Sequence, residues 1–422
     1  MLKLCNDRAL VAPAGISPAL WSTKVSFPLM GRASTVLVFN EAALPLAGAG
    51  GTRHVGLFGR LVAWDATVVA ANRSYVDSSP VKSAGILQTV PVTASSGNGP
   101  KRVLRWVSYM VTSFVYGLRA PKPAVVWGSS PPMTAALSAL LLAKVRRTGF
   151  VLEVRDLWPH ILAETGMFAD TSMIYRALKA LERFLYRQAD AIVILAEGSA
   201  DYIANEGIDR AKMVFVPNGA DPEQMVVHEA RDVLRSEFGF ANFTVVYAGA
   251  HGPANGLELV LDAAEELRAT DVTFVLVGNG SAKRTLQADA DARGLSNVEF
   301  LDPIAKADIP RLFAAADAGL HCLADIDLFQ HGVSPNKLYD YMAAGLPVIT
   351  NTQGEVATMV TQAGAGATVA PDQIAAGVRL IAAQSAPERE RLGAAGIEWM
   401  TTNRSPDAMA RRIEEILERV RR

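Results

Sequence analysis

The sequence alternates between two kinds of segment, and this alternation constrains the fold more than any other feature. From residue 34 onward, short runs rich in β-branched residues are followed by longer amphipathic runs. This pattern is typical of parallel sheets whose strands are joined by helices that cover both faces. The sequence therefore predicts an α/β protein.

The strand candidates form two sets, separated by turn-forming residues between 217 and 222. A chain of 422 residues is also too long for one core, because domains typically hold about 100 to 200 residues. We predict two doubly wound, Rossmann-like domains, at 34–222 and 223–404, that face each other across a cleft. The strands are expected at 34–40, 65–71, 124–130, 150–156, 191–196, 213–219, 243–249, 272–278, 298–302, 318–324, 347–351 and 367–371.

The two ends of the chain are expected to differ. Residues 1–33 contain charged residues and interspersed prolines that interrupt any apolar stretch, so we predict a poorly ordered leader. At the other end, Ser405 and Pro406 open an amphipathic run that predicts a helix over 405–422.

Charge and cysteine content exclude several classes of function. The formal net charge is -1, so no basic field would attract nucleic acid, and we expect no nucleic-acid partner. Cys5 and Cys322 are the only cysteines, too few for a disulfide framework or a four-cysteine zinc site. This usage suits a reducing compartment, and we expect a cytoplasmic protein.

The two most apolar stretches, 106–118 and 134–145, are shorter than the roughly 20 residues of a membrane-spanning helix, so both are expected to be buried helices. Lys101, Arg102 and Arg105 precede the first stretch. Shallow peripheral contact with the inner membrane face is therefore the alternative for that segment.

The turns that follow strands are the natural places for a ligand, because helix N-termini there point free amides outward. The turn after 34–40 is rich in glycine, with Gly50 and Gly51 just before Arg53 and His54. Glycine lets backbone approach a ligand closely, but a flexible surface connection explains the same residues equally well.

The strand at 150–156 delivers Arg155 and Asp156 to its carboxyl end, and Trp158 follows. Charged groups are costly to bury without a partner or a purpose, so we expect these side chains to line the cleft. The alternative is a rim pair of Arg155 and Asp156 with Trp158 packed beneath it.

Two turns in the second half suit phosphate. Gly249, Gly252 and Gly256 surround a tight turn whose amides could cup a diphosphate. After the next strand, Lys283 stands where a dinucleotide-binding loop requires its third glycine, so a dehydrogenase-type loop fails here. A lysine at this position would neutralise phosphate, and a solvated side chain is the alternative.

The segment SPNKLYDYMAAG is the most informative. Ser334 is a natural N-cap and Pro335 a natural first residue of a helix. Lys337 then opposes the helix dipole unless an anion binds at the same end. Asp340 and Tyr341 follow at spacings of three and four, on one face with Lys337. This arrangement matches a nucleotide diphosphate with its ribose behind it. The alternative is a surface ion pair between Lys337 and Asp340.

Over residues 34–420 the chain resembles the family 4 glycosyltransferases, retaining enzymes of the GT-B fold, and especially those that build bacterial cell-surface polysaccharides and lipid-linked glycans. The pieces RDLWP, VPNGADPE and SPNKLYDYMAAGLPVI carry the resemblance. It implies transfer of a hexosyl or acetamidohexosyl group from a nucleotide-diphosphate sugar to an envelope glycan or lipid-linked acceptor. It also implies that the final helix crosses back to the first domain.

The resemblance also implies roles for individual residues. Asp340 would hold the ribose hydroxyls, and Lys283 would supply a second cation to the diphosphate. The implied catalytic residues are Arg155, Asp156 and Lys337, and the implied acceptor-side residues are Arg53, His54 and Trp158. The other donor-binding residues would be Gly50, Gly51, Gly249, Ala250, Pro303, Ile304, Ser334, Pro335 and Asn336.

The chain departs from the family pattern at three places. Of two glutamates that many members place eight residues apart, the first is Gly332 here and the second is Asp340. Arg155 stands where a histidine is frequent, and His251 and Asn255 occupy a loop that often carries an arginine and a lysine. These departures leave open an epimerase or hydrolase of the same fold that acts on nucleotide sugars, or a non-catalytic subunit that binds them.

No metal or other cofactor is expected. Asp325 and Asp327 form a DID sequence of the kind that holds a metal in other transferase folds. They fall in a loop before the donor helix, however, and lysines and helix N-termini already supply positive charge for a diphosphate.

Overall fold

A computed structural model describes residues 34–46, 51–75, 77–95, 99–164, 169–326, 329 and 333–422. The predicted leader at 1–33, together with Gly50, Asp327 and Gly332, lies outside these described residues. Residues 34–422 form one unit, and all that follows concerns that unit.

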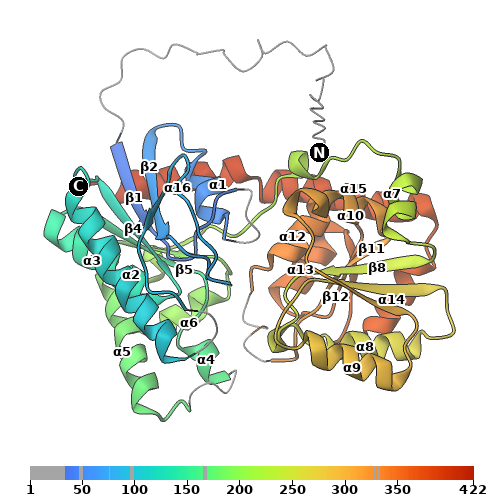
Figure 1. The fold of residues 1–422 in the computed structure, drawn as a ribbon. Helices are drawn as coiled ribbons and strands as arrows, with labels where there is room; N and C mark the ends of the chain where they lie inside the picture. The colour runs from blue at the N-terminus through green and yellow to red at the C-terminus, as the bar shows by residue number, and fades with distance from the viewer. Residues whose placement is uncertain are drawn as a thin grey trace, which may run out of the picture. The chain divides into compact units, whose positions relative to one another are not determined.

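The first domain is built on a parallel sheet, with seven strands among the described residues, in the order β3-β2-β1-β4-β5-β6-β7 (Figure 1). Its strands are β1 (Ser34–Phe39), β2 (Trp64–Ala71), β3 (Leu87–Val90), β4 (Val125–Ser130), β5 (Gly149–Val154), β6 (Ala191–Ile194) and β7 (Met213–Phe215). Its helices are α1 (Arg53–Phe58), α2 (Pro100–Arg119), α3 (Met133–Arg146), α4 (His160–Glu164), α5 (Met173–Gln188) and α6 (Ser199–Asn205). The strand β3 has no counterpart among the sequence-based strand candidates.

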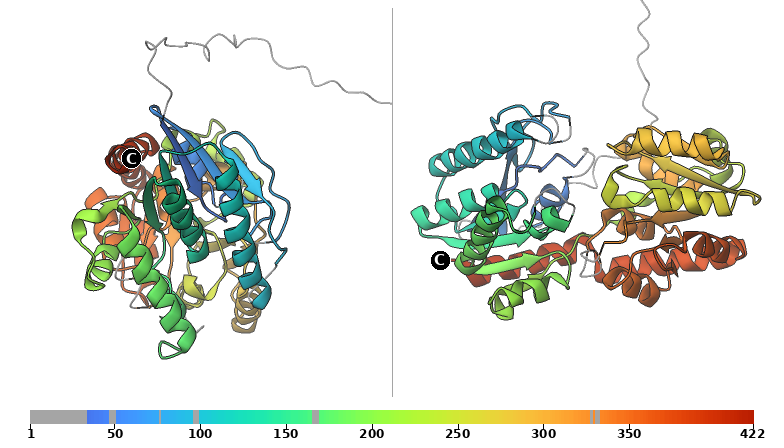
Figure 2. Two further views of the ribbon diagram at one scale, coloured as in Figure 1. Left: turned by 90° about the vertical axis from the view of Figure 1, so that its left-hand side faces the viewer. Right: turned by 90° about the horizontal axis from the view of Figure 1, so that it is seen from below.

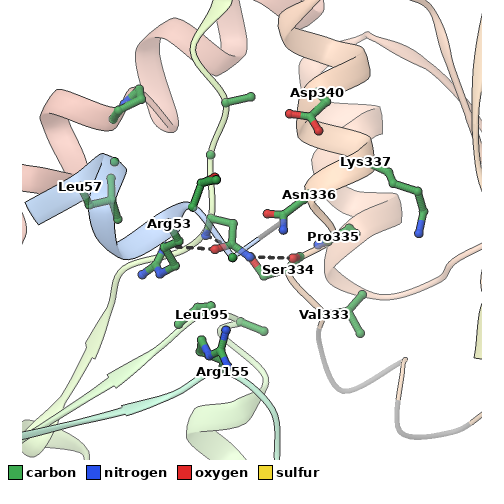
Figure 3. Close-up of a pocket in the computed structure, with 18 of the residues that line it drawn as sticks. Arg53, Leu57, Arg155, Leu195, Val333, Ser334, Pro335, Asn336, Lys337 and Asp340 are labelled. Carbon is green, nitrogen blue, oxygen red and sulfur yellow. Dashed lines mark hydrogen bonds between the residues drawn. The ribbon is translucent and has the colours of Figure 1, made fainter. Parts of the chain in front are cut away.

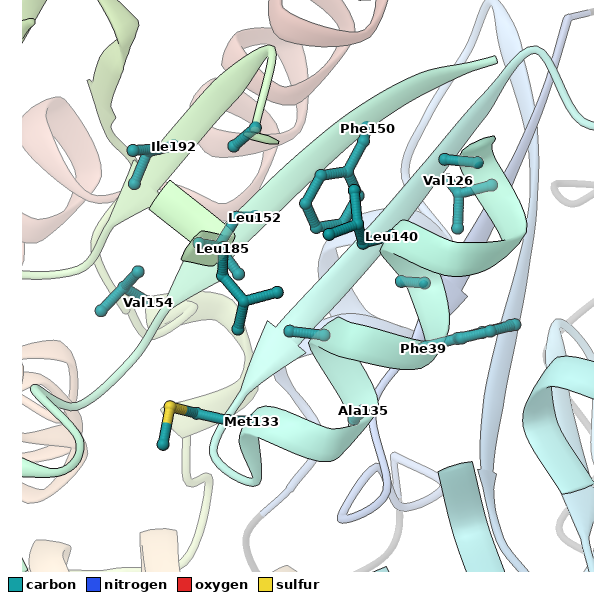
Figure 4. Packing of buried hydrophobic residues seen from close by; sticks show 14 of the residues in the cluster. Phe39, Val126, Met133, Ala135, Leu140, Phe150, Leu152, Val154, Leu185 and Ile192 are labelled. Carbon is teal, nitrogen blue, oxygen red and sulfur yellow. The ribbon is translucent and has the colours of Figure 1, made fainter. Parts of the chain in front are cut away.

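One face of this first sheet is covered by α2, α3 and α5 (Figure 2). The two apolar stretches predicted to be buried helices lie in α2 and α3. The helix α3 packs its small and aliphatic residues, such as Ala135 and Leu140, onto the strands that carry Val126 and Phe150 (Figure 4). Ala136 also lies against Gly128, where an added Cβ would come within 2.9 Å of the Ala136 Cα. The close approach of α3 to the sheet therefore depends on small residues.

The second domain has a parallel sheet with six strands among the described residues, in the order β10-β9-β8-β11-β12-β13. Its strands are β8 (Phe243–Ala248), β9 (Val272–Val277), β10 (Val298–Leu301), β11 (Ala318–His321), β12 (Val348–Thr350) and β13 (Gly366–Thr368). Its helices are α7 (Arg231–Phe238), α8 (Glu258–Glu266), α9 (Lys283–Arg293), α10 (Ile309–Ala315), α12 (Asn336–Ala343), α13 (Glu355–Ala363), α14 (Ile374–Ala382) and α15 (Ala386–Asn403). The helices α8, α9 and α14 pack on one face, and α7, α10, α12 and α13 pack on the other.

The last helix, α16 (Pro406–Val420), belongs to the core of the first domain although it follows the second in sequence. Ser405 caps it, because its side chain accepts a hydrogen bond from the amide of Ala408. Its buried residues, Met409, Ile413, Ile416, Leu417 and Val420, pack with Val36, Val38 and Trp127 of the first sheet. The fold prediction, two Rossmann-like domains with a final helix that returns to the first, is confirmed.

Candidate functional site

A cavity of about 540 Å³ lies at the carboxyl ends of the strands and is lined by residues of both domains (Figure 3). The first domain contributes residues from its strand-to-helix turns, and the second contributes the end of β11 and the start of α12. The predicted site residues that line it are Gly51, Arg53, His54, Arg155, Asp156, Ser334, Pro335, Asn336, Lys337 and Asp340. The fold thus brings residues that are distant in sequence to one cavity.

The helix α12 begins one residue later than the sequence predicts. Pro335 occupies the N-cap position and Asn336 is the first helical residue, without a side-chain cap. The Ser334 hydroxyl is used elsewhere, because its oxygen accepts a hydrogen bond from the Asn218 amide at 3.1 Å. The Asn218 side chain also donates to the Ser334 carbonyl at 3.0 Å. The predicted N-cap thus joins α12 to the segment that follows β7.

Lys337 extends along the inner side of the second domain. Its ammonium donates to the Asn255 side-chain oxygen at 3.0 Å and lies 5.1 Å from the centre of the Tyr247 ring. Burial lowers the pKa of Lys337 to about 8, so the side chain is charged at neutral pH but weakly solvated. Gly249 makes room for this lysine, since a Cβ at that position would lie 2.7 Å from the Lys337 Cδ.

Asp340 lies one turn further along α12, and its carboxylate leaves the helix on a different side from Lys337 (Figure 3). The ion pairs of the described residues do not include one between Lys337 and Asp340. Burial raises the pKa of Asp340 to about 7, an effect that the positive charge of Lys306 partly offsets. The surface ion-pair interpretation is therefore wrong. Both side chains line the cavity.

Tyr341, expected on the same face as Lys337, is instead fully buried. Its hydroxyl oxygen accepts a hydrogen bond from the amide of Ala248 at 2.9 Å, and its ring stacks edge-on against Phe313. Gly319 permits this position, because a Cβ there would come within 2.5 Å of the Tyr341 ring. The tyrosine anchors α12 to the sheet and does not line the cavity.

A buried carboxylate organises the first-domain side of the cavity. Glu153, in β5, accepts hydrogen bonds from Arg53 Nε at 3.0 Å and from His54 Nε2 at 2.5 Å. The other ring nitrogen of His54 lies 2.7 Å from the Asn40 amide nitrogen, which donates to it. Burial lowers the pKa of His54, which favours a neutral ring. With its one proton on Nε2, the ring donates to Glu153 and accepts from Asn40 at Nδ1, so both contacts are satisfied. Burial raises the pKa of Glu153, but His54 and Arg53 outweigh it and hold that pKa well below its ordinary value.

Arg53 also connects this carboxylate to the segment between the domains. Its guanidinium donates to the carbonyl oxygens of Val216 and Pro217, and to the Asn218 side chain at 3.1 Å. Asn218 in turn binds Ser334 at the start of α12. A continuous series of hydrogen bonds therefore runs from Glu153 of β5 through Arg53 and Asn218 to Ser334 before α12. Figure 3 draws the part of it between Arg53 and Ser334.

Arg155 and Asp156 line the cavity as predicted, but Trp158 does not. The Arg155 guanidinium donates to the Pro131 carbonyl at 2.9 Å, while its buried Nε has no hydrogen-bond partner among the described residues. Burial raises the pKa of Asp156, and the charge of Arg155 opposes this. The Trp158 ring instead packs edge-on against Trp106 of α2, with centroids 5.5 Å apart. Trp158 is therefore packed, as that part of the alternative expected, and does not lie in the cavity lining as predicted. The rim pair of Arg155 and Asp156 is not among the ion pairs of the described residues.

The structure also places Lys283 away from the cavity lining. Its ammonium donates to the carbonyl oxygens of Gly278 and Leu301 and to the Asp302 carboxylate, each at 2.9 Å. These partners satisfy all three of its protons, so the lysine clamps the turn after β9 and does not face a phosphate site.

Four other predicted donor-binding residues are likewise absent from the lining, namely Gly249, Ala250, Pro303 and Ile304. Gly249 affects the site indirectly, because its lack of a side chain leaves room for Lys337. Ile304 packs against the core of the second domain. Lys306, two residues beyond Ile304, lines the cavity in their place. Gly51 does line it, with a positive φ of 62°. A Cβ added to Gly51 would lie only 2.4 Å from the Ala42 carbonyl oxygen, so a side chain is not tolerated there.

Sequence reasoning missed three residues that shape the site, Glu153, Asn218 and His321. Glu153 is a lone carboxylate in an otherwise apolar strand, and a charge at such a position signals a buried partner. His321 ends β11 in the same way, as a polar residue at the carboxyl end of a buried strand. Asn218 lies in the turn-forming segment and in the piece VPNGADPE, but neither pattern indicates its contact with Ser334.

Solved structures share this architecture. The chain superimposes on Anabaena HepE in complex with UDP-glucose with a TM-score of 0.68 at 16% identity, covering 91% of this chain and 99% of that one. It matches WaaG, a glycosyltransferase of lipopolysaccharide biosynthesis, with a TM-score of 0.67 at 17% identity, covering 91% and 99%. The fold and the cavity between two Rossmann-like domains define the GT-B class of proteins.

Family models and curated relatives agree with this class. A model described as glycosyl transferases group 1 matches residues 242–384, and one described as a glycosyl transferase 4-like domain matches residues 49–219. The chain belongs to the family 4 glycosyltransferases.

Two curated relatives show how far the similarity extends. The chain is 27% identical over 254 residues to the putative colanic acid biosynthesis glycosyl transferase WcaI of Escherichia coli, covering 58% of this chain and 62% of WcaI, less than two thirds of that relative. It is 24% identical over 297 residues to the probable glycosyltransferase WbjE of Pseudomonas aeruginosa, covering 67% of this chain and 72% of WbjE.

In the part of the chain that the structure describes, every helix is too short or too polar to cross a bilayer.

Proposed function

We propose that this protein transfers a sugar from a nucleotide-diphosphate sugar to a glycan or lipid-linked acceptor of the cell envelope, with retention of anomeric configuration. The observation that carries the proposal is the placement of Lys337 and Asp340, one turn apart on α12, in a cavity that both domains line. The sugar class and retention come from family membership, and the envelope acceptor is suggested by the names of WcaI and WbjE.

In this proposal the protein acts mainly on the leaving group. Breaking the bond between the sugar and the diphosphate places negative charge on the diphosphate, and preorganised positive groups stabilise that charge in the transition state. Lys337 and the free amides at the start of α12 supply them. The low solvation of Lys337 strengthens its interaction with an anion, because less water must be displaced when the anion binds.

The acceptor would enter from the first domain. Arg155 and Asp156 line the cavity there and would orient its hydroxyl, with an oxygen of the departing diphosphate as the proton acceptor. The Asp156 carboxylate can accept hydrogen bonds from hydroxyl groups, as orienting an acceptor requires. This scheme assigns no step to a metal, since the protein supplies the positive charge itself.

The function is tested by a turnover assay that combines a panel of nucleotide-diphosphate sugars with a lipid extract of bacterial envelope. We expect sugar transfer only when both substrates are present, with activity retained in excess EDTA. Full-rate consumption of the donor without acceptor would support the epimerase or hydrolase alternative, and donor binding without any turnover would support the non-catalytic alternative. Loss of activity in EDTA that manganese restores would contradict the metal-free scheme.

Replacing Asp340 with alanine should weaken binding of the cognate nucleoside diphosphate by at least about tenfold, because a carboxylate that accepts two ribose hydroxyls makes charge-assisted hydrogen bonds. The melting temperature should change little, since no ion pair of the described residues involves Asp340. Calorimetric titration of wild type and variant gives both affinities.

A 2′,3′-dideoxynucleotide provides the matched control for Asp340. The wild type should lose affinity for it, whereas Asp340→Ala should bind both nucleotides alike. Wild-type affinity should also fall as the pH drops through about 7, where the carboxylate becomes protonated. Equal binding of the ribonucleotide by variant and wild type would refute the ribose role.

We further propose that α2 contacts an anionic membrane surface, which would bring a lipid-linked acceptor to the cavity. The helix exposes aliphatic residues at helical spacing, and Lys101 is exposed at its start. These residues are Val103, Leu104, Val107, Val111 and Leu118. Arg105, however, is buried in an ion pair with Glu41 at 2.5 Å and cannot contribute to such a surface.

Vesicle sedimentation tests this contact. The double variant Val107→Glu and Val111→Glu should reduce binding to phosphatidylglycerol vesicles by roughly tenfold or more, because each buried aliphatic side chain contributes about 1.5 kcal/mol. The control is Val233→Glu, a valine on α7 of the second domain that is somewhat more exposed than either. Unchanged sedimentation of the double variant, or an equal loss in the control, would contradict the proposal.

A further inference from the structure

His321, the last residue of β11, lines the cavity but none of the interactions described above uses it. Its side chain is fully buried. Its Nδ1 lies 3.0 Å from the Thr350 hydroxyl and 3.4 Å from the Thr352 hydroxyl. Its Nε2 is buried and has no hydrogen-bond partner within the described ranges. Nε2 is therefore the one ring nitrogen that a ligand in the cavity could engage.

The hydrogen bonds around Thr350 fix the tautomer of this ring. The Thr350 hydroxyl oxygen already accepts a hydrogen bond from the Thr352 amide at 3.1 Å. If Nδ1 donated to the second lone pair of this oxygen, the hydroxyl proton would have no acceptor among the described residues, so the arrangement in which the hydroxyl donates to His321 Nδ1 is the one that satisfies both groups. With Nδ1 accepting, the ring proton must reside on Nε2. The network thus places the ring proton on Nε2 of a residue that lines the cavity.

The ring is neutral at physiological pH. Burial, followed by the positive charge of Lys337, lowers the pKa of His321 to about 3. His321, at the end of β11, and Lys337, on α12, both line the second-domain side of the cavity. A neutral N–H beside the ammonium adds a directed hydrogen bond for an anion without adding charge repulsion to the empty site.

Burial of an unpartnered histidine does not by itself identify a ligand site. His251 is also fully buried, and both of its ring nitrogens lack hydrogen-bond partners among the described residues. It packs against Tyr247 and Phe300, however, and is absent from the cavity lining. His321 differs in two ways: it lines the cavity, and its contact with Thr350 leaves the ring proton on the unpartnered nitrogen. Both observations support contact with a ligand.

We propose that His321 is a further donor-binding residue, whose Nε2–H donates a hydrogen bond to a diphosphate oxygen of the bound nucleotide sugar, beside Lys337. Thr350 is its positioning residue, because it holds the ring in the required tautomer. The inference rests on the proposed function. It adds a contact that the family comparison does not assign and that the chain's own residues define.

Two substitutions separate the ring nitrogens. A glutamine places its amide nitrogen near the position of Nε2, whereas the shorter asparagine reaches only the position of Nδ1. We expect His321→Asn to weaken binding of the nucleoside diphosphate that the wild type binds, among UDP, GDP and ADP, by about tenfold. His321→Gln should stay within about threefold of wild type, and binding of the corresponding nucleoside should be unchanged in both.

Calorimetric titration and melting curves decide the outcome, with His251→Asn as the control for loss of a buried histidine. If His321→Asn does not fold, the pair Thr350→Val and Thr350→Ser tests the same inference, because only the serine keeps the hydroxyl that contacts His321 Nδ1. The valine variant should weaken diphosphate binding severalfold and the serine variant should restore it.

Unchanged diphosphate affinity in a folded His321→Asn, or equal losses for diphosphate and nucleoside, would overturn the inference. The proposed function fails separately, if the wild type binds none of the nucleoside diphosphates.

Discussion

Replacing Lys337 with alanine should lower kcat by about 10²- to 10³-fold, the loss typical when one preorganised donor to a developing oxyanion is removed. The lysine is held by Asn255 and the Tyr247 ring, so its ammonium is already positioned before the donor binds. Affinity for the intact donor should change less than kcat, because the negative charge on the diphosphate increases as the sugar leaves. Steady-state kinetics with the cognate donor measures both quantities.

The pH dependence provides a control for Lys337. Its lowered pKa of about 8 means that the ammonium loses its proton above that pH, so wild-type affinity for a nucleoside diphosphate should fall by up to about tenfold per pH unit. A Lys337→Arg variant remains charged throughout and should lack this dependence. A kcat of Lys337→Ala within a few-fold of wild type would contradict the leaving-group role.

Replacing Glu153 with alanine should destabilise the protein by about 3–5 kcal/mol, the usual cost of removing one partner of a buried ion pair. The side chains of Glu153 and His54 are 1% exposed and that of Arg53 is 12% exposed, so water could not replace the lost carboxylate. Arg53 would also hold the segment after β7 less firmly, because the guanidinium contacts that segment while anchored to Glu153. Chemical denaturation measures the loss.

A surface glutamate provides the matched control for Glu153. Glu266 also pairs with an arginine, Arg379, but both side chains are about half exposed. Its replacement by alanine should change the free energy of unfolding by about 1 kcal/mol or less. The variant Glu153→Gln keeps the shape of the side chain without its charge. Its loss of unfolding free energy should lie between those of Glu153→Ala and Glu266→Ala. Similar losses in Glu153→Ala and Glu266→Ala would show that the buried network contributes little.

The periodic pattern of the sequence was sufficient to predict both sheets and the final helix, because strands buried on both faces consist of continuous β-branched runs. The strand β3 escaped prediction, since LQTV is short and buried only at its two ends, Leu87 and Val90. The predicted start of α12 was one residue too early, because a tertiary contact of Ser334 decides where the helix begins. Ser334 is a good N-cap locally, but the folded chain uses its hydroxyl to bind Asn218, which is distant in sequence.

The site could be predicted where the start of a helix after a buried strand fixes a position, as for Lys337 and Asp340, which both line the cavity. Their spacing was nevertheless a poor guide to direction, because the two side chains leave α12 on different sides. The site could not be predicted where carbonyl groups from other strands decide the outcome. Lys283 has the residue type and the sequence position of a phosphate ligand. Its ammonium is nevertheless bound by the carbonyl oxygens of Gly278 and Leu301. No sequence motif marks His321 as a site residue. Its proposed role depends on the hydroxyl groups of Thr350 and Thr352, which only the fold brings beside the ring.

The return of α16 to the first sheet has a consequence for biosynthesis. A ribosome completes the strands that carry Val36 and Trp127 long before it adds Met409 and Leu417, which cover them. Until then the nascent first half exposes an apolar strip that its own residues do not cover, so its maturation must await translation of the entire second half. A fragment that stops at residue 222 should accordingly aggregate on expression, and supplying the α16 segment as a peptide should restore it to solution.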